Sequence, residues 1–159
     1  MKHFKFFFII LFLVTTQLNS EPTLLTQNMN GISPEIHYFC SSENSQIIYE
    51  VIHSEKFQPL PENKNSLGVL RGSCWFFINT LNSLDVPVDW IFQIFHPNYN
   101  FVDFYYITDN KIKKEFHIGS DLPFSLRPLP HKSFLFPVNS LSGEKGRVYI
   151  KVFYKEGGH

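Results

Sequence analysis

The sequence predicts an all-β fold, a jelly-roll or Greek-key β-sandwich with one short helix near residues 44–53. Aromatic residues, which favour strands, are abundant, because the 159 residues include 18 Phe and 7 Tyr. Apolar runs alternate with turn residues at a spacing of roughly 8–15 residues, which is typical of sandwich strands. A proline-rich segment between residues 118 and 133 is too long for a hairpin meander and suits a connection between two sheets.

Strands are expected where apolar residues alternate or cluster between turn residues. Residues 88–96 show the alternation well, with Trp90 and Phe92 on one face and Asp89 on the other. The pair Asp109-Asn110 marks a tight turn between two such runs. The seven expected strands span residues 36–40, 73–80, 88–96, 101–107, 112–118, 133–138 and 147–154.

A short helix is expected between the first two strands. Four apolar residues from Ile47 to Ile52 recur at helical spacing. Ser42 or Asn44 is placed to cap the first turn, so the helix should begin near residue 44.

The first 20 residues have the pattern of a secretory signal peptide. Lys2 and Lys5 precede an unbroken apolar run, residues 6–14, and a tolerable cleavage site ends at Ser20. The run is about half of the ~20 residues that a spanning helix needs, so an uncleaved anchor is the weaker alternative. The expected organisation is a signal peptide over 1–20, a linker over 21–34, the folded domain over 35–154 and a tail over 155–159.

Cys40 and Cys74 are the two cysteines of the sequence. Export makes a disulfide between them chemically feasible. Both lie in apolar, strand-like surroundings, where cysteine also occurs as a small buried hydrophobe, and this second alternative is favoured. The spacing does not show whether the two Cα atoms approach closely enough for a bridge, so the disulfide stays open.

Composition and motifs argue against several classes of function. Acidic and basic residues balance at 14 each, and no basic patch supports nucleic-acid binding. The nucleophile elbow, the phosphate loop and the dinucleotide fingerprint are missing from the sequence, so neither an enzyme nor a bound cofactor is expected. The seven histidines form no closely spaced pair, so no metal site is expected.

The proline-rich segment supplies three polar candidates for ligand contact. Arg127 lies on a stiff loop, where its guanidinium could grip a carboxylate through two hydrogen bonds. We favour a structural alternative, in which Arg127 bonds carbonyls of its own loop or pairs with Asp121 or Asp103. Asp121 and His131 complete this candidate set, and His131 could respond to pH.

Four aromatic residues are candidates for stacking on a sugar ring, because their ring faces are flat and apolar. Trp90 and Tyr99 are the two that we take as ligand-binding candidates, and Tyr105 and Tyr106 raise the same question. Packing in the core or at its rim is the favoured alternative for each of them, since large apolar side chains are usually buried.

Several segments, taken in order, resemble the second type of extracellular domain of bacterial seven-transmembrane receptors with diverse intracellular signalling modules. The stretch GSDLPFSLRP, residues 119–128, is similar to the family's G-D-x-x-P-F-S-x-R-P signature, with Ser120 as an extra residue. The stretch VDFY, residues 102–105, is similar to its V-D-L-Y segment. Phe77 and Asn100 depart from the family, which often has a basic residue and an acid there. The signature positions are Trp75, Asp103, Gly119, Pro123, Phe124 and Pro137.

The resemblance implies a jelly-roll fold similar to carbohydrate-binding modules and a non-catalytic sensory role outside the cytoplasm. It implies a small-molecule ligand, with carbohydrate as the first class to consider, and a membrane-embedded seven-helix partner module that these 159 residues do not contain. The expected location is the periplasm or cell envelope, at the outer face of the inner membrane. An alternative role is an exported protein–protein interaction or spacer module that pairs through an open sheet edge.

Overall fold

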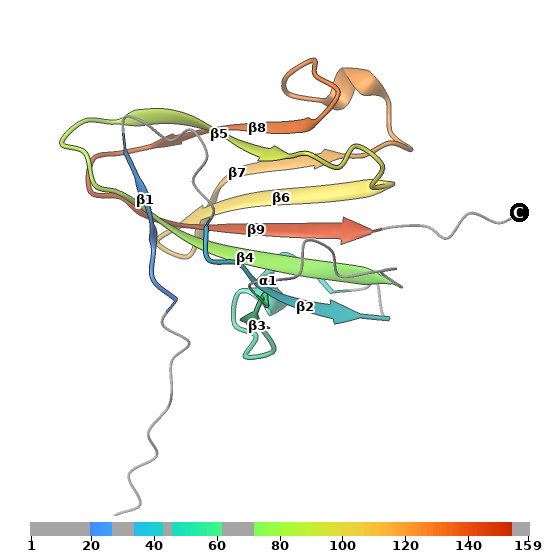
Figure 1. Cartoon of the computed structure of the whole chain (residues 1–159), viewed down its shortest axis with the longest axis horizontal. Helices are drawn as coiled ribbons and strands as arrows, with labels where there is room; N and C mark the ends of the chain where they lie inside the picture. The colour runs from blue at the N-terminus through green and yellow to red at the C-terminus, as the bar shows by residue number, and fades with distance from the viewer. Residues whose placement is uncertain (1–19, 27–33, 43–45, 62–71, 154–159) are drawn as a thin grey trace, which may run out of the picture.

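Two β-sheets face each other in the computed structural model, and the short helix α1 lies on the far side of the larger sheet (Figure 1). The structure describes residues 20–26, 34–42, 46–61 and 72–153. The large sheet has seven strands in the order β3-β2-β4-β9-β6-β7, with β1 parallel to β4, and the small sheet pairs β5 with β8. The prediction of an all-β sandwich is confirmed.

The elements follow the alternation of apolar and turn residues in the sequence. Each of the seven expected strands is present, and no end differs by more than two residues. The β6–β7 turn has Asp109 and Asn110 at φ values of 49° and 58°, the left-handed region that a tight hairpin requires. The elements are β1 (Thr23–Leu25), β2 (His37–Ser41), α1 (Ile48–Val51), β3 (Gln58–Pro59), β4 (Ser73–Asn82), β5 (Val88–Ile94), β6 (Phe101–Thr108), β7 (Lys111–Ile118), the 3-10 turn η1 (Phe124–Leu126), β8 (Phe134–Ser140) and β9 (Lys145–Phe153).

The two sheets enclose the main hydrophobic core. Phe104 on β6 and Phe136 on β8 stack across it with ring centroids 4.5 Å apart, and both are fully buried. Nε1 of Trp90 on β5 donates to Ser140 Oγ over 3.0 Å, and the same hydroxyl lies 2.7 Å from the Tyr106 hydroxyl. These contacts join the small sheet to the large one by apolar burial and by satisfied polar groups.

A second core lies on the opposite face of the large sheet, under α1 and the segment around Phe57 (Figure 1). The Phe57 ring packs edge-on against Phe39, with centroids 4.8 Å apart. Trp75 on β4 is only 1% exposed at this face. Because β4 is covered on both faces, its sequence SCWFFINT is an apolar run rather than a strict alternation.

Two short strands lie where none was expected. β1 falls inside the segment over 21–34 that was expected to be a linker, and its residues 23–25 pair in parallel with residues 80–82. Leu25 is 1% exposed and lies in the main core, so one buried leucine anchors this segment. β3 has two residues, which is too short for a periodic signal.

The helix α1 lies inside the expected range, but its start differs. It begins after Ile47, whose side chain makes no capping hydrogen bond. The helix therefore starts later than the expected position near residue 44, and Ile47 rather than Ser42 is at the cap position; Asn44 lies outside the described residues. Ile48 and Val51 bury the apolar face of the helix in the second core, and this packing rather than a cap stabilises so short a helix.

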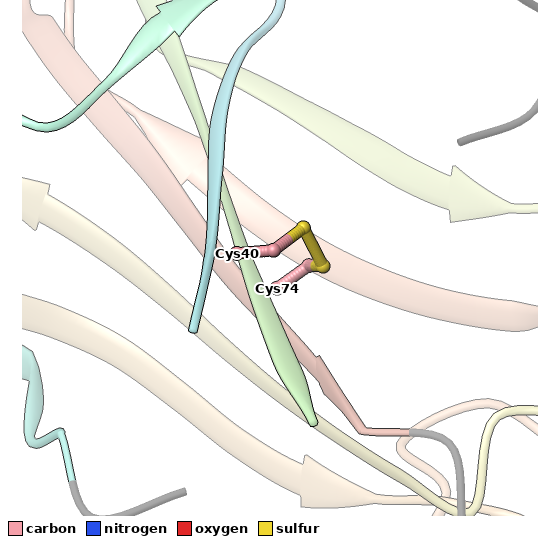
Figure 2. Close-up of a disulfide and its surroundings, with 2 residues drawn as sticks. All are labelled: Cys40 and Cys74. Atoms are coloured by element: carbon pink, nitrogen blue, oxygen red, sulfur yellow. A yellow bond between two sulfur atoms is a disulfide. The ribbon is translucent and has the colours of Figure 1, made fainter. Parts of the chain in front are cut away.

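A disulfide between Cys40 and Cys74 joins β2 to β4 (Figure 2). The two residues are direct partners in the antiparallel register, with Cα atoms 4.1 Å apart. Cys74 is fully buried, whereas Cys40 is exposed. The favoured alternative of two free thiols is wrong, because strand pairing places the cysteines opposite each other on one face of the sheet.

Two expectations fall outside the described residues. The signal peptide over 1–20, apart from Ser20, and the tail over 155–159 belong to segments whose structure is not described. Within the described ranges, none of the helices has the length and apolar character needed to cross a membrane.

Candidate functional site

The proline-rich segment crosses from the end of β7 to the start of β8, and Arg127 lies near its centre. The Arg127 guanidinium donates from Nη1 to the carbonyls of His131, at 2.7 Å, and Lys132, at 3.1 Å. Its central carbon lies 4.9 Å from the Phe124 ring centroid and 4.7 Å from the Phe134 ring centroid. Arg127 thus closes its own loop, as in the favoured structural alternative.

Asp121 and His131 also bond within this part of the fold. The Asp121 carboxylate accepts a hydrogen bond from Asn100 Nδ2 at 2.9 Å. His131 Nδ1 accepts a hydrogen bond from the Ser133 N–H at 3.0 Å. Arg127 and His131 therefore make contacts within the crossing segment itself, whereas Asp121 bonds Asn100 in the connection between β5 and β6 rather than Arg127.

Two signature residues meet steric demands of the backbone. A Cβ atom at Gly119 would lie 1.9 Å from the carbonyl oxygen of Asn100, so the close approach of the two chain segments requires glycine. Pro137 lies in β8, which pairs only with β5 among the described strands, and an edge strand tolerates a residue without an N–H. Both residues therefore have a structural explanation.

Three of the four aromatic candidates do not gather on one surface. Trp90 is 8% exposed and Tyr106 is fully buried, and both bond Ser140 in the main core. Tyr99 is half-buried beside His96, with ring centroids 5.2 Å apart. Burial raises the pKa of the Tyr99 phenol above its usual value. Core and rim packing accounts for all three positions.

A set of polar and aromatic side chains gathers instead on the outer face of the large sheet. We call this set the polar face and define it as Phe101, Asp103, His117, Lys151 and Phe153. In the strand register, Asp103 on β6 lies opposite both Lys151 on β9 and His117 on β7. Phe101 and Phe153 form the neighbouring pair, with ring centroids 6.0 Å apart. The hairpin of β6 and β7 and the more distant strand β9 thus contribute to one surface.

Asp103 is at the centre of the polar face. Its Oδ1 lies 2.9 Å from His117 Nδ1, and the two side chains are 30% and 54% exposed. The Lys151 ammonium lies 5.6 Å from the Trp75 ring centroid and donates to the Gln46 carbonyl at 3.4 Å. Burial lowers the pKa of Lys151, and the nearby Asp103 carboxylate opposes this shift.

Tyr105 lies beside the polar face, where it is 8% exposed. Its ring stacks on Trp75 with centroids 6.2 Å apart and meets His117 edge-on at 5.8 Å. Burial raises the pKa of Tyr105 to about 12, and the carboxylates of Asp103 and Glu115 add to the shift. The hydroxyl is therefore neutral at physiological pH and keeps its capacity to donate a hydrogen bond.

The polar face has the chemistry of a binding surface. Asp103 supplies hydrogen-bond acceptors, Lys151 supplies donors, and the rings of Phe101 and Phe153 supply apolar area. Among the described residues, no three metal-ligating side chains come together.

Sequence reasoning misses His117 and Lys151 and takes Asp103 as a structural residue only. A weak signal exists, because Asp103 and Lys151 are polar residues inside the apolar strands FVDFYYIT and KGRVYIKVF. The pairing of β6 with β9, which joins distant parts of the chain, brings these two residues together. That pairing cannot be read from local periodicity.

A sequence model of one family, described as 7TMR-DISM extracellular 2, matches residues 33–156. The chain belongs to this family of receptor extracellular domains. No curated protein sequence matches the chain significantly. The resemblance to this family is confirmed by the match, and domains of this family are typically non-catalytic.

Proposed function

We propose that the chain is a non-catalytic sensory domain that binds a small polar ligand at the polar face, with carbohydrate as the ligand class. The observation that carries the proposal is the row of Lys151, Asp103 and His117, which come from three adjacent strands. The rings of Phe101 and Phe153 lie next to this row. The family of receptor extracellular domains supports a sensory role.

The polar face matches the chemistry of a sugar. Sugar hydroxyls both donate and accept hydrogen bonds, while the C–H faces of the ring are apolar. The Asp103 carboxylate only accepts and the Lys151 ammonium only donates, so the two can engage neighbouring hydroxyls of one ring. Phe101 is 37% exposed, which leaves part of its ring free to pack on the ligand.

The crossing segment has a bracing role in this proposal. The Arg127 guanidinium lies between two aromatic rings and is bonded to carbonyls of its own loop. Asp121 and His131 have hydrogen-bond partners in the same region. We therefore assign these three residues to loop stability, Trp90 to the main core and Tyr99 to the junction between loops.

The same proposal places the domain outside the cytoplasm, in the periplasm or cell envelope at the outer face of the inner membrane. Residues 1–20 would direct export as a cleaved signal peptide. The partner would be a membrane-embedded seven-helix module, and a ligand would signal to it by binding one of two conformations more tightly. The family description supports an extracellular location.

A panel of neutral and acidic oligosaccharides and small metabolites tests the proposal, by thermal shift first and by calorimetry next. We expect a ligand whose affinity falls about tenfold or more in Asp103→Asn, because the charged acceptor is lost. The matched control is Asp89→Asn on the small sheet, where Asp89 accepts an exposed hydrogen bond from Asn139 at 2.8 Å, and its affinity should be unchanged. A folded protein that binds nothing in the panel contradicts the proposal, as does a ligand indifferent to Asp103→Asn.

Pairing with another protein through the β7 edge of the large sheet has less support. β7 is an edge strand of the large sheet, and its sequence KIKKEFHI carries four charged residues. Charged side chains on an edge strand oppose pairing with a second chain. Crosslinking in envelope extracts that captured a partner through β7 would favour this alternative over ligand binding.

A further inference from the structure

The connection from β5 to β6 and the crossing segment meet at the end of the sandwich where β9 ends, at the right of Figure 1, and both carry exposed apolar side chains. Phe95, which directly follows β5, is 79% exposed, and Phe124 and Leu126 in η1 are 57% and 52% exposed. We call these three residues the apolar tip. Exposed apolar side chains on neighbouring loops offer apolar area to a partner surface.

Hydrogen bonds hold the two loops of the apolar tip together. The Ser120 N–H donates to the Tyr99 carbonyl at 2.9 Å, and the Asp121 N–H donates to the Asn100 carbonyl at 3.3 Å. The Asn100 side chain also donates to the Asp121 carboxylate at 2.9 Å. These bonds fix the turn that follows Phe95 against the segment that leads into η1, so the apolar side chains are presented from one assembly.

Arg127 holds the Phe124 ring away from the core. Its guanidinium lies between the Phe124 ring and the fully buried Phe134 ring. The same group is bonded to the carbonyls of His131 and Lys132, which fixes its position. The loop is therefore ordered before it meets a partner, and docking costs little additional conformational entropy.

The charge around the apolar tip suits an anionic surface. Residues 95–100 and 119–133 contain two basic residues, Arg127 and Lys132, against the single acid Asp121. Asp121 is exposed and accepts a hydrogen bond from Asn100, and Lys132 is exposed as well.

We propose that the apolar tip docks on a lipid bilayer that carries anionic headgroups, with Phe95, Phe124 and Leu126 in the interfacial region. Segments that bind at this depth combine exposed aromatic and aliphatic side chains with basic neighbours. The chain belongs to a family of receptor extracellular domains, so a bilayer surface lies within its reach. The contact sets the orientation of the sandwich on the membrane.

Tryptophan probes test the proposal. Phe95→Trp and Phe124→Trp each place a probe at the tip, and the control Leu141→Trp places one at a 55% exposed position that follows β8, at the opposite end. The native Trp75 and Trp90 are 1% and 8% exposed and give a constant background. With vesicles of phosphatidylethanolamine and phosphatidylglycerol with brominated chains, we expect blue-shifted, quenched emission from both tip probes and neither change in the control.

Removal of the apolar side chains gives a second readout. In Phe95→Ser/Phe124→Ser/Leu126→Ser, partitioning into the same vesicles should fall by about tenfold or more. The matched control Val86→Ser/Leu141→Ser removes two exposed residues from the opposite end and should partition as the native chain does. If the triple variant folds poorly, the site-specific probes still decide the question. They also decide it in an uncleaved chain, because the apolar residues 6–14 would bind lipid there and mask the change in partitioning.

Three results of the vesicle experiments would each overturn the proposal. They are tip probes that stay unquenched, a control probe that is quenched as strongly as the tip probes, and a folded triple variant that partitions like the native chain. A concentration-dependent dimer that only the triple variant abolishes also overturns it, because a second copy would then cover the tip. Lipid docking is independent of the polar face, so the triple variant should keep its oligosaccharide affinity. A silent oligosaccharide panel would leave the vesicle result unchanged.

Discussion

Asn82 joins three chain segments at the end of the sandwich opposite the crossing segment. Its side chain is fully buried at the end of β4. Nδ2 donates to the carbonyls of Val86, Ser140 and Leu141 at 3.0, 3.2 and 2.8 Å, and Oδ1 accepts from the Leu84 N–H at 3.0 Å. One amide therefore holds the β4–β5 turn against the β8–β9 turn.

The substitution Asn82→Ala removes these four contacts and leaves their partners without the amide. At about 1 kcal/mol for each lost hydrogen bond, and with water reaching some of the freed groups, the free energy of unfolding should fall by about 3 kcal/mol. Asn82→Asp should cost at least as much, because a carboxylate cannot donate and would face three carbonyl oxygens.

Urea unfolding followed by tryptophan fluorescence measures this loss. The matched control is Asn139→Ala, which removes one exposed hydrogen bond to Asp89 and should cost less than about 1 kcal/mol. If Asn82→Ala cost no more than Asn139→Ala, the reasoning that a buried amide holds the two turns together would be refuted.

Three further changes have defined expected effects. Serine at both Cys40 and Cys74 should lower the free energy of unfolding by about 4 kcal/mol, because the bridge has a sequence separation of 34; equal urea midpoints would contradict this. Gly119→Ala should cost about 2 kcal/mol or more, since its Cβ would lie 1.9 Å from the Asn100 oxygen; an unchanged melting temperature would oppose it. Stability should fall between pH 10 and about 12, because the unfolded phenol of Tyr105 ionises near 10.0 while the folded one keeps its proton to a pKa of about 12. Tyr105→Phe should flatten this slope in urea titrations at several pH values, and an unaltered slope would count against the assignment.

The main strands are predictable because their signals are local. Trp90 and Phe92 alternate with outward residues along β5, and the Asp109-Asn110 turn takes the left-handed backbone that these residue types tolerate. β1 is not predictable, because three residues carry no period and Leu25 acts through pairing with a distant strand. The disulfide likewise depends on the register of β2 against β4, which spacing does not reveal.

The candidate site is predictable only in part. The role of Arg127 can be anticipated, because its carbonyl partners His131 and Lys132 lie four and five residues along the same loop. The polar face cannot be anticipated, since Asp103 meets Lys151 only after β6 pairs with β9. Residue types that bind a polar ligand are present in the sequence, but long-range strand order decides which of them share a surface.

Chemical-shift mapping of the isotope-labelled domain with the oligosaccharide panel tests the central claim most directly. The account predicts that a bound oligosaccharide shifts the amide signals of Asp103, His117 and Lys151 most, together with those of Phe101 and Phe153, and that the crossing segment over 119–133 changes little. The largest shifts within 119–133, or no shift with any member of the panel, would contradict it.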